Sequence, residues 1–215
     1  MSLDLAAALY SLPAVVMGLT VHEYSHARMA YALGDATAAR EGRLTLDPLK
    51  HIDPLGFLFL AIAGFGWAKP VRFSRESLRD PRRDEALIAA AGPLSNLVIA
   101  ILISVLLRLA LLVFPYFQIE GGSIGRLVFN LLVYSVYVNY GLFIFNMIPI
   151  PPLDGSHLLL GALRIKPEVE AKAYRFGTFT LFAILAIETG TGADILPIGT
   201  AVRAMARAVF WVLGF

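Results

Sequence analysis

Residues 21–26 read Val-His-Glu-Tyr-Ser-His, and they lie within an apolar run over residues 13–33. An apolar run of this length favours a helix, and helical residues four apart lie one above the other on the same face. His22 and His26 therefore present both imidazoles to one point, which is half of a tetrahedral zinc site. Glu23 follows the first histidine directly, where its carboxylate can reach a water on the metal, as a general base requires.

The apolar setting of these three residues favours a functional role over a purely structural one. In a water-soluble helix, two histidines and a glutamate are commonly satisfied by hydrogen bonds and carry little information. Within a membrane-like run, each ionisable group costs about 2.5–3.5 kcal/mol to insert, so such groups are usually retained for function. The chain contains no cysteine, so a metal must be bound by His, Asp or Glu.

The composition indicates an integral membrane protein. Hydrophobic residues make up 58% of the 215 residues, only 16% are charged, and the mean hydropathy is +0.71. A water-soluble domain of this size does not need so apolar a composition. The formal net charge of +2 is too small to suggest nucleic-acid binding. We therefore predict an all-α, multi-pass membrane protein in contact with the lipid bilayer.

Polar breaks between the apolar runs predict the organisation of the chain. Residues 43–47, within the polar region 36–53, are interpreted as a short strand or an interfacial loop. Residues 55–68 are too few to span the bilayer and predict a re-entrant or membrane-edge segment. Full spans are predicted over residues 86–114 and 127–145, and a final pair of membrane segments over 176–187 and 195–213.

These segments are predicted to form a single domain over residues 1–215. Its core covers about residues 13–160, and additional C-terminal membrane helices cover about residues 166–215. Gly92, within the first full span, is expected to allow close helix packing. Asn96 and Asn139, in the two full spans, are expected to form interhelical hydrogen bonds rather than to take part in chemistry.

The positive charges predict the orientation in the membrane. Nine of the 18 lysine and arginine residues lie between the first helix and residue 86, which the positive-inside rule places in the cytoplasm: Arg40, Arg43, Lys50, Lys69, Arg72, Arg75, Arg79, Arg82 and Arg83. At about 1.5 Å per residue from Pro13, His22 then lies near or below the bilayer centre. We expect a multi-pass protein of the cell membrane with its active site in the cytoplasmic half.

Asp154 is the leading candidate for a third metal ligand, because it lies at the same predicted depth. A catalytic zinc uses three protein ligands and keeps one position open for water. The run from Asn146 to Gly155 contains three prolines, so it cannot continue as an α-helix. Asp154 could instead cap the following helix. His157 is a competing ligand, although a fourth protein group would leave no position for water.

A second pair of residues, His51 and Asp53, could also bind a metal. Prolines lie on both sides of this pair. Prolines and aspartates are common in turns and at helix caps, so the sequence favours turn and cap roles for both residues.

Two segments far apart in the chain form a paired signature. The first is the motif at residues 22–26, and the second reads Asn146-x-x-Pro149-x-Pro151-x-Leu153-Asp154-Gly155. Together they resemble the site-2 proteases, a family of intramembrane zinc metallopeptidases. Residues 64–70 and 91–96 are also similar to segments of its short bacterial and archaeal members. The resemblance covers about residues 13–160 and indicates the short form of the family, without a PDZ domain.

The resemblance implies that His22, His26 and Asp154 bind one Zn²⁺ per chain and that Glu23 is the general base. It further implies that Asn146 holds the substrate strand or the oxyanion. The implied fold has a three-helix catalytic core with membrane helices added around it. The implied activity is that of a zinc endopeptidase, which uses a zinc-bound water to hydrolyse a peptide bond in or near a transmembrane segment of a membrane-protein substrate.

The alternative function is a metal or proton transporter that uses the same buried cluster of histidines and carboxylates at a broken helix. A transporter explains the buried charges and the proline-rich break. It does not require a glutamate next to a ligand histidine, and no inverted repeat in the sequence supports it. The residues therefore favour the peptidase.

Overall fold

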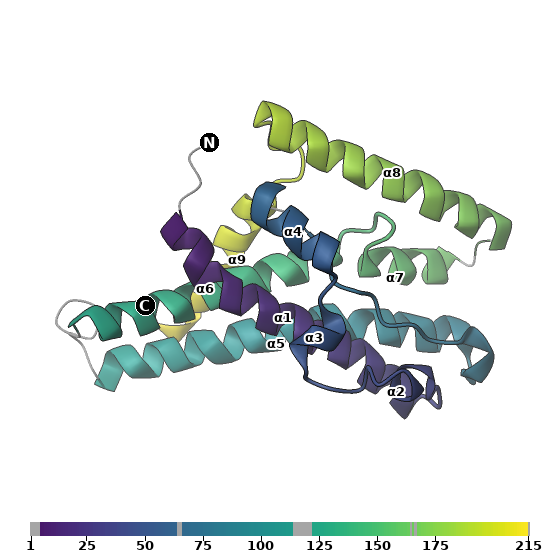
Figure 1. Ribbon diagram of the computed structural model, residues 1–215, viewed down its shortest axis with the longest axis horizontal. Coiled ribbons are helices and arrows are strands. Elements are labelled where there is room, and N and C mark those ends of the chain that lie inside the picture. The colour runs from purple at the N-terminus through teal and green to yellow at the C-terminus, as the bar shows by residue number, and fades with distance from the viewer. Residues whose placement is uncertain (1–4, 64–65, 114–121, 164, 166, 215) are drawn as a thin grey trace.

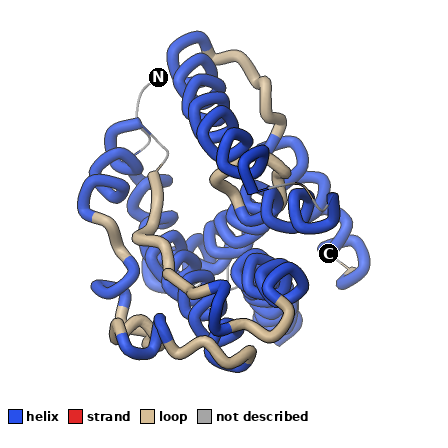
Figure 2. Tube along the Cα trace, turned by 90° about the vertical axis from the view of Figure 1, so that its right-hand side faces the viewer, coloured by secondary structure: helices blue, strands red, loops and turns tan. Residues whose placement is uncertain are grey.

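The computed structural model describes residues 5–63, 66–113, 122–163, 165 and 167–214. In these ranges the protein is helical, and its pairing of extended backbone is confined to one antiparallel bridge between Ile52 and Ala68 (Figures 1 and 2). This confirms the all-α prediction. The helices, with the 3-10 helix η1, are α1 (Leu5–Ala32), α2 (Thr37–Arg40), α3 (Pro48–His51), α4 (Pro54–Ala63), η1 (Arg75–Ser77), α5 (Pro81–Val113), α6 (Gly122–Asn146), α7 (Asp154–Leu163), α8 (Pro167–Thr191) and α9 (Ile198–Leu213).

Three long helices, α1, α5 and α6, pack against one another and form the centre of the protein (Figure 1). Small buried residues at their contacts, such as Ala30 and Ala100, allow the backbones to approach closely. On the far side of α6, Val136 and Tyr140 pack against α9 through Val202. The structure therefore contains a three-helix centre with further helices added, as the resemblance implied.

Two helices in the described part of the chain are long and apolar enough to cross a membrane. They are α5, over Pro81–Val113, and the part of α6 from Ile124 to Asn146. Both contain the spans predicted from the sequence over residues 86–114 and 127–145, as far as these residues are described. Large apolar side chains on α5, including Leu102 and Leu106, are exposed on its outer face. This surface agrees with an all-α membrane protein.

The region between α1 and α5 contains loops and short helices. The strand interpretation of residues 43–47 is wrong, and the alternative, a loop, is what the structure shows. The reason is local, because Asp47 accepts a hydrogen bond from Leu49 N at 3.0 Å and so begins α3 at Pro48. Helix α4 has only 10 residues, in agreement with a segment too short to span. Residues 64–65 of the predicted re-entrant segment lie outside the described residues.

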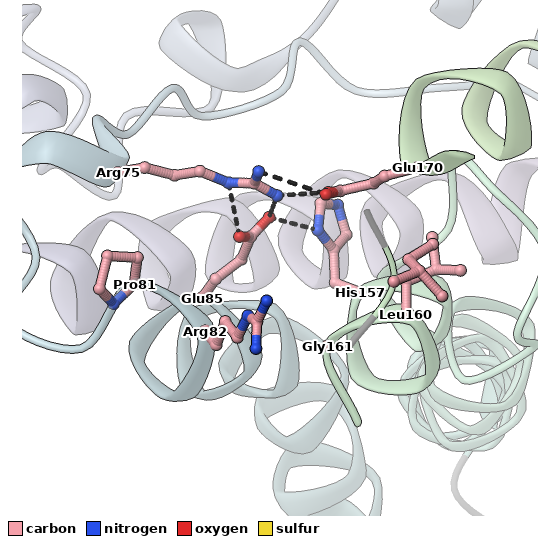
Figure 3. A pocket seen from close by; sticks show the side chains of 9 residues that line it. Arg75, Pro81, Arg82, Glu85, His157, Leu160, Gly161 and Glu170 are labelled. Atoms are coloured by element: carbon pink, nitrogen blue, oxygen red, sulfur yellow. Dashed lines mark hydrogen bonds and ion pairs between the residues drawn. The ribbon is translucent and has the colours of Figure 1, made fainter. Parts of the chain in front are cut away.

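A polar network connects η1, α5, α7 and α8 (Figure 3). Arg75 Nε lies 2.7 Å from Glu85 Oε2, and the same guanidinium forms an ion pair with Glu170 on α8. His157 Nδ1 donates to Glu85 Oε1 at 2.9 Å, and Tyr174 OH donates to His157 Nε2 at 2.6 Å. The network fixes α7, whose first residue is the candidate third ligand.

Candidate metal centre

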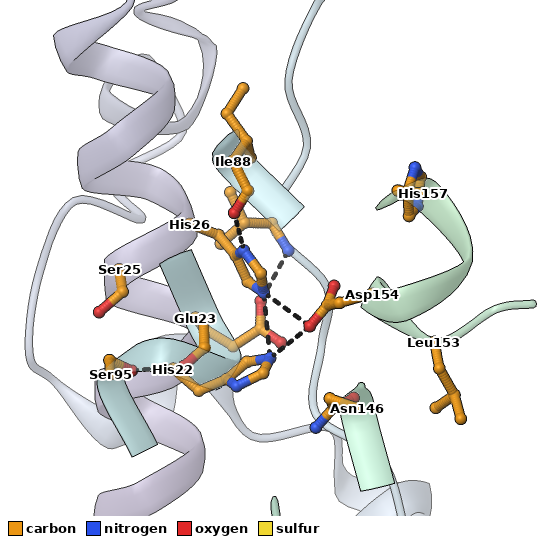
Figure 4. Close-up of polar contacts among 12 residues, drawn as sticks. His22, Glu23, Ser25, His26, Ile88, Ser95, Asn146, Leu153, Asp154 and His157 are labelled. Atoms are coloured by element: carbon orange, nitrogen blue, oxygen red, sulfur yellow. Dashed lines mark hydrogen bonds and ion pairs between the residues drawn. The ribbon is translucent and has the colours of Figure 1, made fainter. Parts of the chain in front are cut away.

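Three ligand atoms meet between α1 and the first residue of α7 (Figure 4). Asp154 Oδ2 lies 3.1 Å from His22 Nε2 and 3.3 Å from His26 Nε2, and the two nitrogens are 3.0 Å apart. Zinc bonds of about 2.0–2.1 Å to tetrahedral ligands separate those ligands by roughly 3.3 Å. The spacing of the three atoms therefore fits one zinc ion.

The backbone explains how these side chains reach one point. Helix α1 continues through the motif, so its two histidines lie on one face, as the sequence predicted. After α6 the chain turns tightly through residues 147–153, and a Cβ on Gly155 would lie 2.4 Å from Met147 O. Only glycine fits this close approach, which brings Asp154 back toward α1. Sequence reasoning thus located all three candidate ligands.

The candidate third ligand carries a buried oxygen that suits a metal. Asp154 Oδ2 is buried and has no hydrogen-bond partner among the described residues. A buried carboxylate oxygen without a donor is unfavourable unless a cation compensates it. Asp154 is the first residue of α7, and this oxygen faces the imidazoles (Figure 4). The geometry supports a ligand role more directly than a helix-capping role.

Hydrogen bonds to helix α5 fix the orientation of both imidazoles. His22 Nδ1 donates to Asn96 Oδ1 at 2.8 Å, and His26 Nδ1 donates to Ile88 O at 2.7 Å. With their protons on Nδ1, both rings direct the Nε2 lone pairs toward the centre. Such contacts to the second ring nitrogen are the usual partners of metal-binding histidines.

The buried amide of Asn96 also ties three helices together. Its Nδ2 donates to Gly18 O and to Asn139 Oδ1, each at 3.0 Å, which confirms the predicted interhelical hydrogen bonds. Sequence reasoning missed the contact to the candidate ligand His22. The sequence did contain a signal for this contact, because Asn96 lies four residues after Gly92 and thus on the same helix face.

Gly92 forms the wall of the site on α5. A Cβ at this position would lie 2.3 Å from His26 Nε2 and 2.7 Å from His22 Nε2. Close packing at Gly92 was predicted, and the structure shows that the space serves the two imidazoles. Glycine leaves room for the metal beside them.

The two predicted catalytic residues lie in the same cavity as the candidate ligands. This cavity has a volume of about 290 Å³, and Glu23, Asn146 and Asp154 line it. Glu23 is only 7% exposed, and its Oε2 accepts a hydrogen bond from Val71 N at 2.9 Å. Asn146 is the last residue of α6, and its Nδ2 donates to Leu142 O at 3.0 Å. The structure therefore brings all five predicted site residues together.

The two competing metal-site hypotheses are not supported by the geometry. His157 uses both ring nitrogens in the network around Glu85 and is not part of the candidate metal-binding group, which in the described residues comprises His22, His26 and Asp154. His51 Nε2 donates to a backbone carbonyl at 2.7 Å, and Asp53 accepts from Gly56 N at 2.9 Å at the start of α4. Asp53 therefore has the cap role that the prolines predicted, whereas His51 is a buried residue at the end of α3 and has neither a turn nor a cap role.

Comparison with known proteins connects this geometry to a family. Residues 113–185 match the family model described as Peptidase family M50. "Putative zinc metalloprotease YwhC" of Bacillus subtilis is 36% identical over 192 residues, which cover 87% of this chain and 84% of that protein. "Putative zinc metalloprotease Rip2" of Mycobacterium tuberculosis is 31% identical over 185 residues, which cover 82% of this chain and 66% of that protein.

An archaeal relative extends the comparison. "Putative zinc metalloprotease MJ0611" of Methanocaldococcus jannaschii is 30% identical over 151 residues, which cover 69% of this chain and 68% of that protein. No solved structure matches the chain. The similarity to YwhC covers most of both chains, and the helices of this protein bring together side chains that could bind one zinc ion. The protein therefore belongs to peptidase family M50, the site-2 proteases, and is a zinc metalloprotease.

Proposed function

We propose that this metalloprotease cleaves a peptide bond in or near a transmembrane segment of a membrane-protein substrate. His22, His26 and Asp154 are its metal ligands in this proposal. The observation that carries it is the position of the cavity, whose walls include α5 and α6, which are the two helices in the described residues that are long and apolar enough to cross a membrane. A cavity between such helices is reached most directly by a substrate that is itself in the bilayer.

The chemistry divides between the metal and the side chains around it. When bound, zinc supplies a Lewis acid that activates water and polarises the scissile carbonyl. Glu23 takes the proton of the attacking water and passes it to the leaving nitrogen. The Val71 amide, which donates to Oε2 of Glu23, fixes this carboxylate and leaves Oε1 for the proton. Asn146 holds the substrate strand or the oxyanion as charge develops on the carbonyl oxygen.

A transmembrane substrate must be unwound locally before it is cleaved, because a helix keeps its carbonyls in i→i−4 hydrogen bonds. Trp67 and Val71, from a part of the chain that is not helical, line the cavity together with the candidate ligands. In our proposal, the unwound substrate lies along this part of the chain. We further propose that this part lies on the cytoplasmic side of a multi-pass cell-membrane protein, a side that the nine basic residues between 40 and 83 favour.

The decisive experiment replaces the general base. Glu23→Gln keeps the size of the side chain and removes its ability to take a proton. We expect this variant to retain one zinc per chain and to cleave a membrane-embedded reporter about 10²–10⁴-fold more slowly. Glu76→Gln, at an exposed glutamate of η1, is the matched control and should cleave as the wild type does.

Two results would contradict the proposal. Unchanged cleavage by Glu23→Gln would exclude Glu23 as the base. Zinc flux into vesicles by the wild type, with no cleavage by either form, would support the transporter instead. A reporter that lacks its transmembrane segment tests the substrate class, because we expect it to be cleaved far less than the membrane-embedded one.

A further inference from the structure

Residues 66–74, here called the 66–74 segment, connect α4 to η1 beside the catalytic base. The segment is not helical, although Ser74 O accepts from Ser77 N at the start of η1, and its pairing with other backbone includes the bridge from Ala68 to Ile52. Its Val71 N–H donates to Glu23 Oε2 at 2.9 Å. Backbone outside regular secondary structure keeps its position only if other groups hold it. The position of the Glu23 carboxylate therefore depends on what holds this segment.

Arg43 holds the segment at the two residues that precede Val71. Its Nη2 donates to Lys69 O, and its Nη1 donates to Pro70 O at 3.5 Å. A guanidinium presents donors in a rigid, planar fork, which suits two neighbouring carbonyls better than the single ammonium of lysine. Arg43 is only 5% exposed, although it lies in a loop. Gly42, with φ of +68°, forms the turn that directs Arg43 inward.

His51 completes this support. Its Nε2 donates to Thr45 O at 2.7 Å, so its Nδ1 is free to accept from Arg43 Nη2 at 3.5 Å. Its backbone carbonyl also accepts from Lys69 N at 2.8 Å. His51 is 1% exposed. The buried pair of Arg43 and His51 thus contacts both the amide and the carbonyl of Lys69, and it is occupied with backbone groups rather than with a metal.

The other end of the segment has a separate anchor. Asp35 Oδ2 accepts from Ser74 N at 2.9 Å, and Asp35 Oδ1 accepts from the backbone and hydroxyl of Thr37. Asp35 therefore fixes where the segment ends, and Arg43 fixes the residues next to the catalytic base. The metal ligands are held differently, by Asn96 and Ile88 on α5.

We propose that Arg43 is a positioning residue for peptide hydrolysis, because it sets the 66–74 segment so that Val71 N–H fixes the Glu23 carboxylate. This inference rests on the proposed function. A displacement of about 1 Å at a reacting group lowers a rate by roughly 10²-fold. Loss of the Arg43 fork should therefore lower kcat and leave zinc binding intact, since the metal ligands have their own supports.

The test compares three variants with the wild type in proteoliposomes that contain a membrane-embedded reporter. Arg43→Met keeps the aliphatic stem and removes all donors, and Arg43→Lys keeps the charge without the fork. Arg40→Met is the control, at an exposed arginine whose guanidinium bonds Thr37 in the described residues and not the 66–74 segment. The measurements are kcat, KM, zinc per chain and amide hydrogen exchange in peptides that cover residues 66–74.

We expect Arg43→Met to lower kcat about 10²-fold, with KM within about twofold of the wild type and one zinc per chain. Amide hydrogen exchange should become faster in the 66–74 segment and stay unchanged in α1. Arg43→Lys should show a smaller loss of kcat, and Arg40→Met none. A purely structural residue would instead reduce zinc content and protection throughout the chain.

Three results would overturn the inference. The first is wild-type kcat for Arg43→Met, and the second is a lower kcat without faster exchange in the 66–74 segment. The third is an Arg43→Met protein that fails to fold while Arg43→Lys behaves as the wild type. Failure of the proposed function is distinguishable, because the wild type and Glu23→Gln would then cleave equally or not at all. The exchange measurement still tests the structural role of Arg43 in that case.

Discussion

Replacing Gly92 with alanine would place a methyl group among the candidate metal ligands. The new Cβ would lie 2.3 Å from His26 Nε2 and 2.7 Å from His22 Nε2. Non-bonded heavy atoms prefer separations of about 3.5 Å or more, so the nearer ring must retreat by roughly 1 Å. Metal–ligand distances tolerate only about 0.2 Å. The variant should therefore lose much of its zinc affinity.

The size of the expected loss of zinc affinity follows from how closely the groups around the two histidines hold them in place. Disturbing the groups that orient a ligand typically lowers metal affinity by about 10–100-fold. Gly92→Ala displaces two candidate ligands and occupies space beside both, so we expect at least about a 100-fold loss of zinc affinity. Since each factor of ten is about 1.4 kcal/mol, this loss corresponds to about 2.8 kcal/mol of binding free energy.

Zinc affinity is measured by competition with a chromophoric chelator, and the fold is checked by thermal unfolding of the metal-free protein. Gly141→Ala is the matched control, because a Cβ there meets its nearest neighbour, Val202 Cγ2, only at 4.0 Å. Alanine in a helix is otherwise favourable by about 0.5–1 kcal/mol relative to glycine. Wild-type zinc affinity in Gly92→Ala would refute the assignment of this space to the metal centre.

Two further predictions concern Asn96, which supports a candidate ligand, and Asp35, which anchors the 66–74 segment. Asn96→Leu should lower zinc affinity about 10–100-fold in the same competition assay, whereas Asn139→Leu should lower it less, because in the described residues its side chain bonds Asn96 and Ser135 and not a candidate ligand. Burial alone would raise the pKa of Asp35, but the hydrogen bonds that it accepts outweigh burial and lower this pKa below its usual value. The stability from Asp35 is therefore present above about pH 4, the unfolded pKa, and is lost as the pH falls through the folded pKa. Asp35→Asn should lower the thermal unfolding midpoint more at pH 6 than at pH 3, and equal losses at both pH values would contradict this.

Short-range geometry made several features predictable. The spacing of His22 and His26 places them on one helix face whatever the rest of the chain does. The prolines before Asp154 must end a helix, and they indicated a turn with polar backbone at the depth of the histidines. The structure of residues 43–47 was harder to predict, because alternating polar and apolar side chains are typical of a strand. Capping by Asp47 decided in favour of a loop and a short helix.

The sequence by itself determined the helical membrane class, the paired imidazoles and the proline-broken turn, because composition and local backbone geometry act within a few residues. Only the tertiary structure decided which groups support the site. Asn96 reaches His22 across 74 residues of sequence, and the Val71 amide reaches Glu23 across 48. The first contact depends on how far α5 is shifted and rotated against α1, and the second depends on where the 66–74 segment lies against α1. Many weak packing contacts set that arrangement together, and none of them leaves a periodic pattern in the sequence.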